Sequence, residues 1–176
     1  MKKILKVLLV LMTVVSIAGC SSKTTTEKAT KKTKTLSGNY QVEIKVKDYG
    51  TIYAEIDADT APITVTNFVK LSKEKFYDGL TFHRIIDGFM IQGGDPKGDG
   101  TGGSKETIKG EFSDNGVKNP LSHTRGALSM ARSQDNDSAS SQFFIVQSDS
   151  TYLDGQYAVF GYVYEGMDIV DKICDD

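Results

Sequence analysis

The sequence has no tryptophan, three prolines and two cysteines among its 176 residues. Two cysteines make at most one disulfide, so the fold must depend on a packed core. Its longest apolar run, Val7–Val15 with Thr13 inside it, is shorter than the roughly 20 residues of a membrane-spanning helix. Glycine is abundant, with 17 residues, which favours tight turns over long helices. The length predicts a single folded domain.

The first nineteen residues have the pattern of an export signal. Three lysines come first, the apolar run follows, and small residues lead to Cys20. A short apolar stretch between basic and small residues is typical of a cleaved signal peptide. The tetrapeptide Ile17–Cys20 resembles the lipobox of bacterial lipoproteins, in which the cysteine carries a lipid. We therefore expect a signal peptide over residues 1–19 and a lipid on Cys20. The alternative is an ordinary signal peptide followed by an incidental cysteine.

Residues 20–38 are rich in lysine, threonine and serine and have no periodic apolar face. Such a segment buries too little surface to offset its loss of conformational entropy. We expect it to be a disordered tether between the lipid and a folded domain at residues 39–176. Without residues 1–19 the chain keeps 18 basic and 23 acidic residues, a net charge of −5. This acidic balance argues against a nucleic-acid partner. We expect a monomer, anchored on the extracytoplasmic face of the cell membrane.

Hydrophobic periodicity in the folded part predicts many short strands and few helices. Residues 40–46 and 52–56 alternate between apolar and polar side chains around a turn at residues 48–50, which predicts a β-hairpin. The other expected strands cover residues 80–86, 89–93, 126–131, 142–147 and 158–164, and helices are expected at residues 62–73 and 167–174. Asp59 or Thr60 is the expected cap of the first helix. This order favours an antiparallel barrel or sandwich.

Three blocks of the sequence, in the expected order, resemble a known family. Phe82–Asp95, Ser141–Ile145 and Leu153–Gly155 resemble the signature blocks of cyclophilins, and Thr64–Leu71 resembles the family's first helix. Three ordered blocks are far more specific than one short motif. The chain is thus similar to cyclophilin-type peptidyl-prolyl cis/trans isomerases. The resemblance implies rotation about the peptide bond before proline, with no cofactor.

The resemblance also implies a fold and a site. Cyclophilins are mainly β, with an eight-stranded antiparallel barrel capped by two helices. Their last strand follows the second helix and closes the barrel against the first strand. This sequence ends at Asp176, so we expect seven strands here. The substrate groove is expected at His83, Phe89, Met90, Gln92, Ala131, Arg132, Gln142, Phe144, Leu153 and Tyr157. Tyr157 stands where many cyclophilins have His, and Arg132 where Asn is common.

Arg84 is the expected catalytic residue. The barrier to rotation, about 20 kcal/mol, comes from the double-bond character of the C–N bond. A guanidinium is always protonated, and its donation to the prolyl nitrogen would favour the twisted state over the planar one. A hairpin centred on Gly88 would place Arg84 opposite Gln92, on the same face as Met90.

Other features of the sequence have simpler explanations than further sites. His83 and His123 lack the carboxylate cluster of a zinc site or a catalytic triad. The glycine-rich residues 93–104 lack the Gly-Lys-Ser/Thr ending of a phosphate-binding loop. Residues 135–137 lack the glycine and the terminal glutamate of a calcium loop. We therefore expect no metal.

The sequence leads to an expected function and two alternatives. We expect an isomerase that acts on unfolded or extended Xaa-Pro segments of exported proteins and assists their folding at the cell surface. The first alternative is a proline-segment binding module or chaperone with little catalysis, and the second is a purely structural lipoprotein. Arg84 and Gln92 favour the enzyme, whereas the absence of the last strand favours the binding module.

Overall fold

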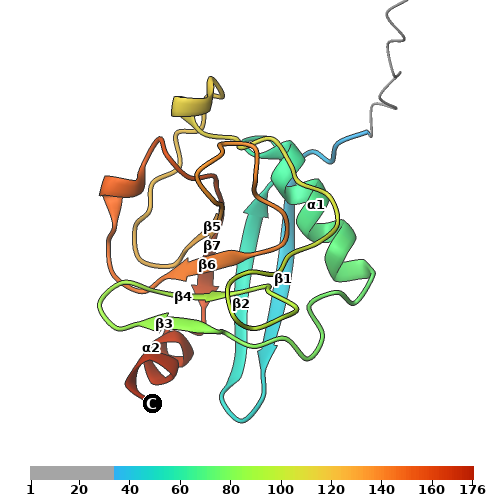
Figure 1. Cartoon of the computed structure of the whole chain (residues 1–176). Helices are drawn as coiled ribbons and strands as arrows, with labels where there is room; N and C mark the ends of the chain where they lie inside the picture. The colour runs from blue at the N-terminus through green and yellow to red at the C-terminus, as the bar shows by residue number, and fades with distance from the viewer. Residues whose placement is uncertain (1–33) are drawn as a thin grey trace, which may run out of the picture. The chain divides into compact units, whose positions relative to one another are not determined.

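The structure, a computed structural model, describes residues 34–176 (Figure 1). The expected signal peptide over residues 1–19, the lipid on Cys20 and most of the expected tether over residues 20–38 lie outside the described residues. The N–H of Leu36 donates to Thr66 Oγ1 at 2.8 Å, and the Leu36 side chain packs against the core. Within the described residues, contacts with the folded domain therefore extend at least to Leu36, three residues before the expected boundary at residue 39.

In the part of the chain that the structure describes, seven antiparallel strands form one sheet, as the sequence predicts. They are β1 (Asn39–Val46), β2 (Gly50–Asp57), β3 (Arg84–Ile86), β4 (Met90–Gly93), β5 (Ala127–Met130), β6 (Phe143–Val146) and β7 (Val159–Glu165). Their order is β1-β2-β7-β5-β6-β4-β3, so β1 and β3 are the two edges. The helices are α1 (Pro62–Lys73) and α2 (Met167–Asp175), with short 3-10 turns at Ser113–Asn115 and Thr151–Leu153. No helix in residues 34–176 has the length and apolar character needed to cross a membrane.

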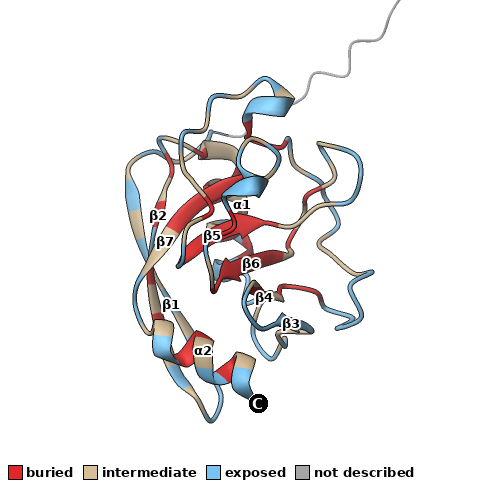
Figure 2. Cartoon of the chain, turned by 90° about the vertical axis from the view of Figure 1, so that its left-hand side faces the viewer, coloured by how far each residue is buried: buried red, intermediate tan, exposed pale blue. Residues whose placement is uncertain are grey.

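The central strands β5 and β6 are buried along their whole length (Figure 2), and their apolar side chains belong to two clusters on opposite faces of the sheet. Ile91, Phe143 and Ile145 face the main core, which also contains residues of α1 and α2. Their chain neighbours Met90 and Phe144 belong to a second, smaller cluster. Successive side chains of a strand point to opposite faces of the sheet. One run of backbone therefore serves two apolar clusters.

The β3–β4 hairpin has the predicted register but a shorter first strand. Arg84 lies opposite Gln92, and Gly88 in the turn has a φ of 74°. The strand expected over residues 80–86 is wrong for its first four residues, because β3 begins at Arg84. On the partner side, β4 ends at Gly93, and Gly94 with a φ of 83° turns the chain away. Residues 80–83 are thereby left without a strand to pair with.

Helix α1 begins at the predicted residue, but neither Asp59 nor Thr60 caps it. Instead, Thr60 Oγ1 donates to a carboxylate oxygen of Asp57 at 2.6 Å in the preceding turn. The cap comes from Glu111, which is 2% exposed and accepts from two N–H groups of the first turn at 2.9 and 2.8 Å. A carboxylate there is also favoured by the helix dipole. The predicted cap was therefore wrong, since a distant loop supplies it.

Candidate active site

Nine of the eleven expected catalytic and substrate-binding residues line one cavity of about 220 Å³. They are Arg84, Phe89, Met90, Gln92, Ala131, Arg132, Phe144, Leu153 and Tyr157. Gln142 lines an adjoining cavity of about 380 Å³ that shares Gln92, Ala131 and Arg132 with the first. His83 lines neither cavity, and neither of its ring nitrogens has a hydrogen-bond partner among the described residues. The expected groove residues therefore converge, with His83 as the exception.

Arg84 sits at the rim of the cavity, on the exposed edge strand β3. Its Nη1 donates to Gln92 Oε1 at 3.3 Å and lies 3.8 Å from the sulfur of Met90. Its guanidinium carbon is 5.9 Å from the centre of the Phe89 ring. The contacts hold the guanidinium against the cavity wall. They leave Nη2 and Nε without a partner in residues 34–176, so these donors can face a bound molecule.

Gln92 is itself fixed by a chain of side-chain hydrogen bonds. Its Nε2 donates to Gln142 Oε1 at 2.8 Å, and Gln142 Nε2 donates to the carbonyl oxygens of Gly102 (2.7 Å) and Gly100 (3.1 Å). Because the amide nitrogens are used in this direction, the carbonyl oxygen of Gln92 must face Arg84. The glycine-rich loop thus orients the residue that braces the guanidinium.

The floor of the cavity is apolar and closely supported. Met90 and Phe144 are 1% and 5% exposed, and Phe89 and Leu153 pack beside them. The ring of Phe144 stacks on His123, with ring centres 5.9 Å apart and planes at 14°. An apolar recess of this kind suits a pyrrolidine ring, which has no polar group to satisfy.

His123 is fully buried beneath Phe144 and was assigned no function from the sequence. Its Nδ1 lies 2.7 Å from Asp154 Oδ1, and its Nε2 lies 3.0 Å from Ser129 Oγ. Burial lowers the pKa of His123, although the hydrogen bond to Asp154 opposes this shift. The neutral ring then donates from Nδ1 to the carboxylate and accepts from the serine hydroxyl. Ser129 is also fully buried, so this trio supports the cavity and offers no nucleophile.

Arg132 forms a side wall and is held by its own contacts. Its guanidinium carbon lies 4.7 Å from the centre of the Tyr157 ring and 5.1 Å from that of Phe112. Its Nη2 and Nε donate to the carbonyl oxygen of Gln156, at 2.9 and 3.1 Å. Sequence reasoning missed Phe112 and Gln156, because no local signal marks a residue that stacks on, or accepts from, a distant arginine.

The arrangement combines an arginine fork at the rim, a fixed amide beside it and a dry apolar recess. In residues 34–176 no cluster of three or more His, Cys, Asp or Glu side chains could hold a metal ion. Rotation about a C–N bond breaks no σ-bond. Fixed hydrogen-bond donors and an apolar recess are therefore sufficient to catalyse such a rotation.

Comparisons with known proteins agree with this geometry. The family model described as "Cyclophilin type peptidyl-prolyl cis-trans isomerase/CLD" matches residues 41–175. Peptidyl-prolyl cis-trans isomerase B of Bacillus subtilis is 49% identical over 73% of this chain and 86% of its own length. A Helicobacter pylori peptidyl-prolyl cis-trans isomerase is 44% identical over 80% and 77% of the two chains. A Cryptosporidium parvum cyclophilin-type isomerase, crystallised in the presence of the dipeptide Ala-Pro, superposes with a TM-score of 0.71 at 33% identity, covering 77% of this chain and 85% of that one.

Proposed function

The chain belongs to the cyclophilin-type peptidyl-prolyl cis-trans isomerase family, and we propose that it isomerises Xaa-Pro bonds of exported proteins at the cell surface and so assists their folding. It is an enzyme of this class, as its relatives are. The main support for the proposal is that Arg84 and the apolar side chains of the recess line the same cavity. Clients would be extended or unfolded segments, because a planar Xaa-Pro bond must reach the cavity floor.

In the proposed mechanism Arg84 is the catalytic residue. A free N–H of its guanidinium would donate to the prolyl nitrogen as the C–N bond twists. In the planar bond the nitrogen lone pair is delocalised into the carbonyl, so it becomes a good acceptor only in the twisted state. The interaction is therefore stronger in the transition state than in the ground state, which is the condition for catalysis. Gln92 supports this role by holding Nη1 at 3.3 Å, so the guanidinium is already oriented.

The remaining site residues would bind the substrate. Phe89, Met90, Phe144 and Leu153 would surround the proline ring. Gln142, Ala131 and Arg132 border the adjoining cavity, where the residues before the proline would lie. The N–H of Ala131 already donates to the carbonyl oxygen of Gln142 at 3.0 Å. Because this N–H is already used, the substrate carbonyls would be held by side chains and by other backbone N–H groups of the adjoining cavity.

A refolding assay separates the enzyme from a module that only binds proline segments. The client is an unfolded protein whose slow phase is limited by prolyl isomerisation, which takes tens of seconds without a catalyst. We expect the protein to accelerate this phase at one molecule per hundred clients. A binding module would instead slow refolding, or act only at equimolar amounts. Binding without acceleration would overturn the proposed catalysis and support the alternative.

The proposed location depends on Cys20 and the basic start of the sequence. A signal peptide would deliver the chain across the membrane, and a lipid on Cys20 would retain it there. We expect the mature protein to begin at Cys20, with a mass increase equal to its acyl groups, and to sediment with membranes. Cys20→Ala should release the protein into the soluble fraction without changing its isomerase activity. If the wild-type protein and the variant fractionate alike, the proposal of a lipid anchor on Cys20 is wrong. The assignment as an isomerase is not affected by that result.

A further inference from the structure

Gln147 lies directly after β6 and does not line the cavity of Arg84. The residue is 8% exposed, so its side-chain amide is largely removed from water. The amide oxygen accepts from the N–H of Gly88 at 2.6 Å, and Nε2 donates to the carboxylate of Asp87 at 3.1 Å. A longer bond of 3.4 Å joins Nε2 to the carboxylate of Asp171 on α2. One buried side chain therefore connects the turn between β3 and β4 with α2.

The partners of Gln147 determine which side chain can stand at this position. The Gly88 N–H needs an acceptor, and the two carboxylates need donors. A reversed amide would turn its NH₂ group toward the Gly88 N–H and its oxygen toward both carboxylates, so only one orientation satisfies all three partners. Glutamate would offer no donor, and lysine would offer no acceptor. The position therefore calls for an amide of this length.

The turn that Gln147 contacts has a defined shape. Its closing bond runs from the Phe89 N–H to the Ile86 carbonyl oxygen at 3.1 Å, which places Asp87 and Gly88 at its centre. Gly88 has a φ of 74°, the sign that a type II turn requires at its third residue. The closing bond does not use the Gly88 N–H, which instead donates to Gln147. Both central residues are exposed, so their bonds to a buried partner limit their movement.

Phe89 follows this turn and forms a wall of the cavity. The centre of its ring is 6.2 Å from that of Tyr152 and 5.9 Å from the guanidinium carbon of Arg84. The Phe89 carbonyl oxygen accepts from the main-chain N–H of Gln147 at 2.8 Å. Gln147 thus bonds to three consecutive residues, Asp87 to Phe89. Because the backbone torsions of a turn set the direction of the chain that leaves it, the contacts of Gln147 with the turn also set the position of the Phe89 ring.

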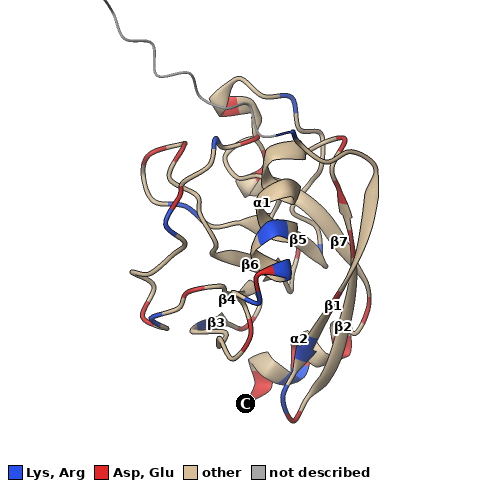
Figure 3. Cartoon of the chain, turned by 90° about the vertical axis from the view of Figure 1, so that its right-hand side faces the viewer, with Lys and Arg blue, Asp and Glu red and all other residues tan. Residues whose placement is uncertain are grey.

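The main chain of Gln147 is held by other groups. Arg125 Nη1 donates to the Gln147 carbonyl oxygen at 2.7 Å, and Arg125 also bonds to the Asp171 carboxylate. Helix α2, which carries acidic and basic side chains (Figure 3), packs against β3 and β4. The backbone of Gln147 is therefore fixed independently of its side chain. A substitution there should change the contacts with the turn more than it changes the sheet.

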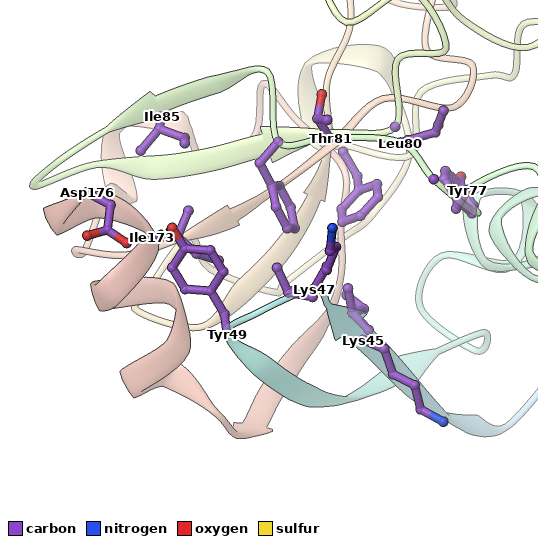
Figure 4. Close-up of a pocket in the computed structure, with 16 residues that line it drawn as sticks. Lys45, Lys47, Tyr49, Tyr77, Leu80, Thr81, Ile85, Ile173 and Asp176 are labelled. Atoms are coloured by element: carbon purple, nitrogen blue, oxygen red, sulfur yellow. Dashed lines mark hydrogen bonds between the residues drawn. The ribbon is translucent and has the colours of Figure 1, made fainter.

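The groove of about 570 Å³ in Figure 4 is a different part of the molecule. It lies between the β1–β2 hairpin and the β3–β4 hairpin, where Ile85 lines it from the face of β3 opposite Arg84. Neither Gln147 nor the two central residues of its turn line this groove. The contacts of Gln147 therefore act on the cavity of Arg84 and not on the groove.

We propose that Gln147 is a positioning residue of the isomerase site, which fixes the turn at Asp87 and Gly88 and thereby holds the Phe89 ring against the substrate proline. This role rests on the proposed function of the cavity. Gln92 holds Arg84 farther along the same hairpin, with Nη1 at 3.3 Å from its Oε1. One glutamine therefore braces the strands of the β3–β4 hairpin, and another braces its turn.

The two glutamines should affect different kinetic constants. Arg84 would bond to the prolyl nitrogen only as the C–N bond twists, so a disturbance of Gln92 lowers kcat. The Phe89 ring would touch the proline in the planar and in the twisted state alike. Loss of an interaction that is equal in both states raises KM and leaves kcat unchanged. A defect at Gln147 should therefore appear in KM.

The first test is Gln147→Met, which keeps the length of the side chain and removes its hydrogen bonds to the turn. We expect KM for a short Ala-Pro peptide to rise about fivefold, the loss typical of one hydrogen bond, while kcat changes by less than about twofold. Amide exchange at Gly88 should become faster. Asp171→Ala, which removes the partner on α2 and leaves the contacts with the turn, is the matched control and should change neither constant. An unchanged KM, a fall in kcat alone, or equal effects of the two variants would overturn the proposal.

The second test combines Gln147→Met with Phe89→Leu. The rise in KM caused by Gln147→Met should shrink to less than about twofold once the ring is absent, because residues that act through one another are not additive. Additive effects would contradict positioning through Phe89. NMR titration with the same peptide gives the Kd of each variant without any turnover. If the wild-type protein binds the peptide but does not isomerise it, the proposed function fails, and the same comparison of Kd values still decides the role of Gln147.

Discussion

The two faces of β3, β4 and β6 use the same backbone for different purposes. On one face Arg84, Gln92 and Phe144 line the isomerase cavity, and each is held by a partner. On the other face Ile85 and Phe143 line a separate groove of about 570 Å³. Adjacent residues of one strand therefore serve different surroundings: Phe144 lines the isomerase cavity, and Phe143 belongs to the main core. Sequence neighbours are therefore matched controls for each other.

Truncation of Phe143 or Phe144 should have a large effect on stability, but only one of the two should affect catalysis. Both are 5% exposed, and truncation of such a ring costs about 3–5 kcal/mol of unfolding free energy. We expect Phe143→Ala and Phe144→Ala to lose comparable stability, measured by urea unfolding. Only Phe144→Ala should lower kcat/KM of the folded protein, by about tenfold or more, because Phe143 packs edge-on against Phe68 at 5.4 Å, away from the cavity. The milder Phe143→Leu and Phe144→Leu serve if either alanine variant does not fold. Equal kinetic losses would break the comparison.

A smaller effect concerns the pH dependence of the free energy of unfolding that comes from His123, which lies beneath the floor of the cavity. Burial lowers the pKa of His123 in the folded state, so the unfolded chain binds the proton more readily. Stability is therefore unaffected well above the unfolded pKa of about 6.5 and falls as the pH drops below it. We expect the free energy of unfolding to fall between pH 7.5 and 5.5 because the unfolded chain takes up this proton more readily than the folded one.

The control for this acid response is His123→Gln, which removes the titrating group. Its unfolding free energy should change less than that of the wild type over the same interval, although it is lower at pH 7.5 because the bonds to Asp154 and Ser129 are weakened. Hydrogen bonds from Ser122 and His123 hold the pKa of Asp154 below its usual range despite burial that raises it. The stability that the ionised Asp154 contributes is therefore lost only below the pH interval of this experiment, as the pH falls through its lowered pKa. An unchanged pH slope in the variant would contradict the assignment.

The smallest expected effect concerns the ion pair between Arg125 and Asp171 of α2. Arg125 makes two bonds to the Asp171 carboxylate of α2, at 2.9 and 2.6 Å, and one to the Gln147 carbonyl oxygen at 2.7 Å. The side chains of this ion pair are 43% and 40% exposed, so the pair is worth about 0.5 kcal/mol. A double-mutant cycle of Arg125→Ala and Asp171→Ala, followed by urea unfolding, should measure this coupling with kcat/KM unchanged. A coupling several times larger would mean that α2 depends on the pair.

Short-range features of the site were predictable from the sequence. The pairing of Arg84 with Gln92 follows from one turn residue, because a hairpin register is fixed by its loop. The start of α1 was also predictable, because proline is favoured in the first turn of a helix and Pro62 stands there. Glu111 could not be predicted as the cap, because it lies almost fifty residues from the helix that it caps. The same holds for the contacts of the Arg132 guanidinium with the rings of Tyr157 and Phe112, and for the stacking of His123 on Phe144. These contacts depend on tertiary packing, which leaves no local pattern in the sequence.

Arg84 is central to the proposed catalysis, and one measurement tests its role directly. NMR exchange spectroscopy of a short Ala-Pro peptide gives the rate of interconversion at catalytic amounts of protein. We expect Arg84→Ala to lower the catalysed rate about a hundredfold, since loss of one oriented donor commonly costs this much. Stability should be nearly unchanged, because the side chain is exposed. Arg84→Lys should recover little of the rate, because an ammonium lacks the rigid fork. A variant without Arg84 that is folded and retains most of the wild-type rate would contradict the mechanism.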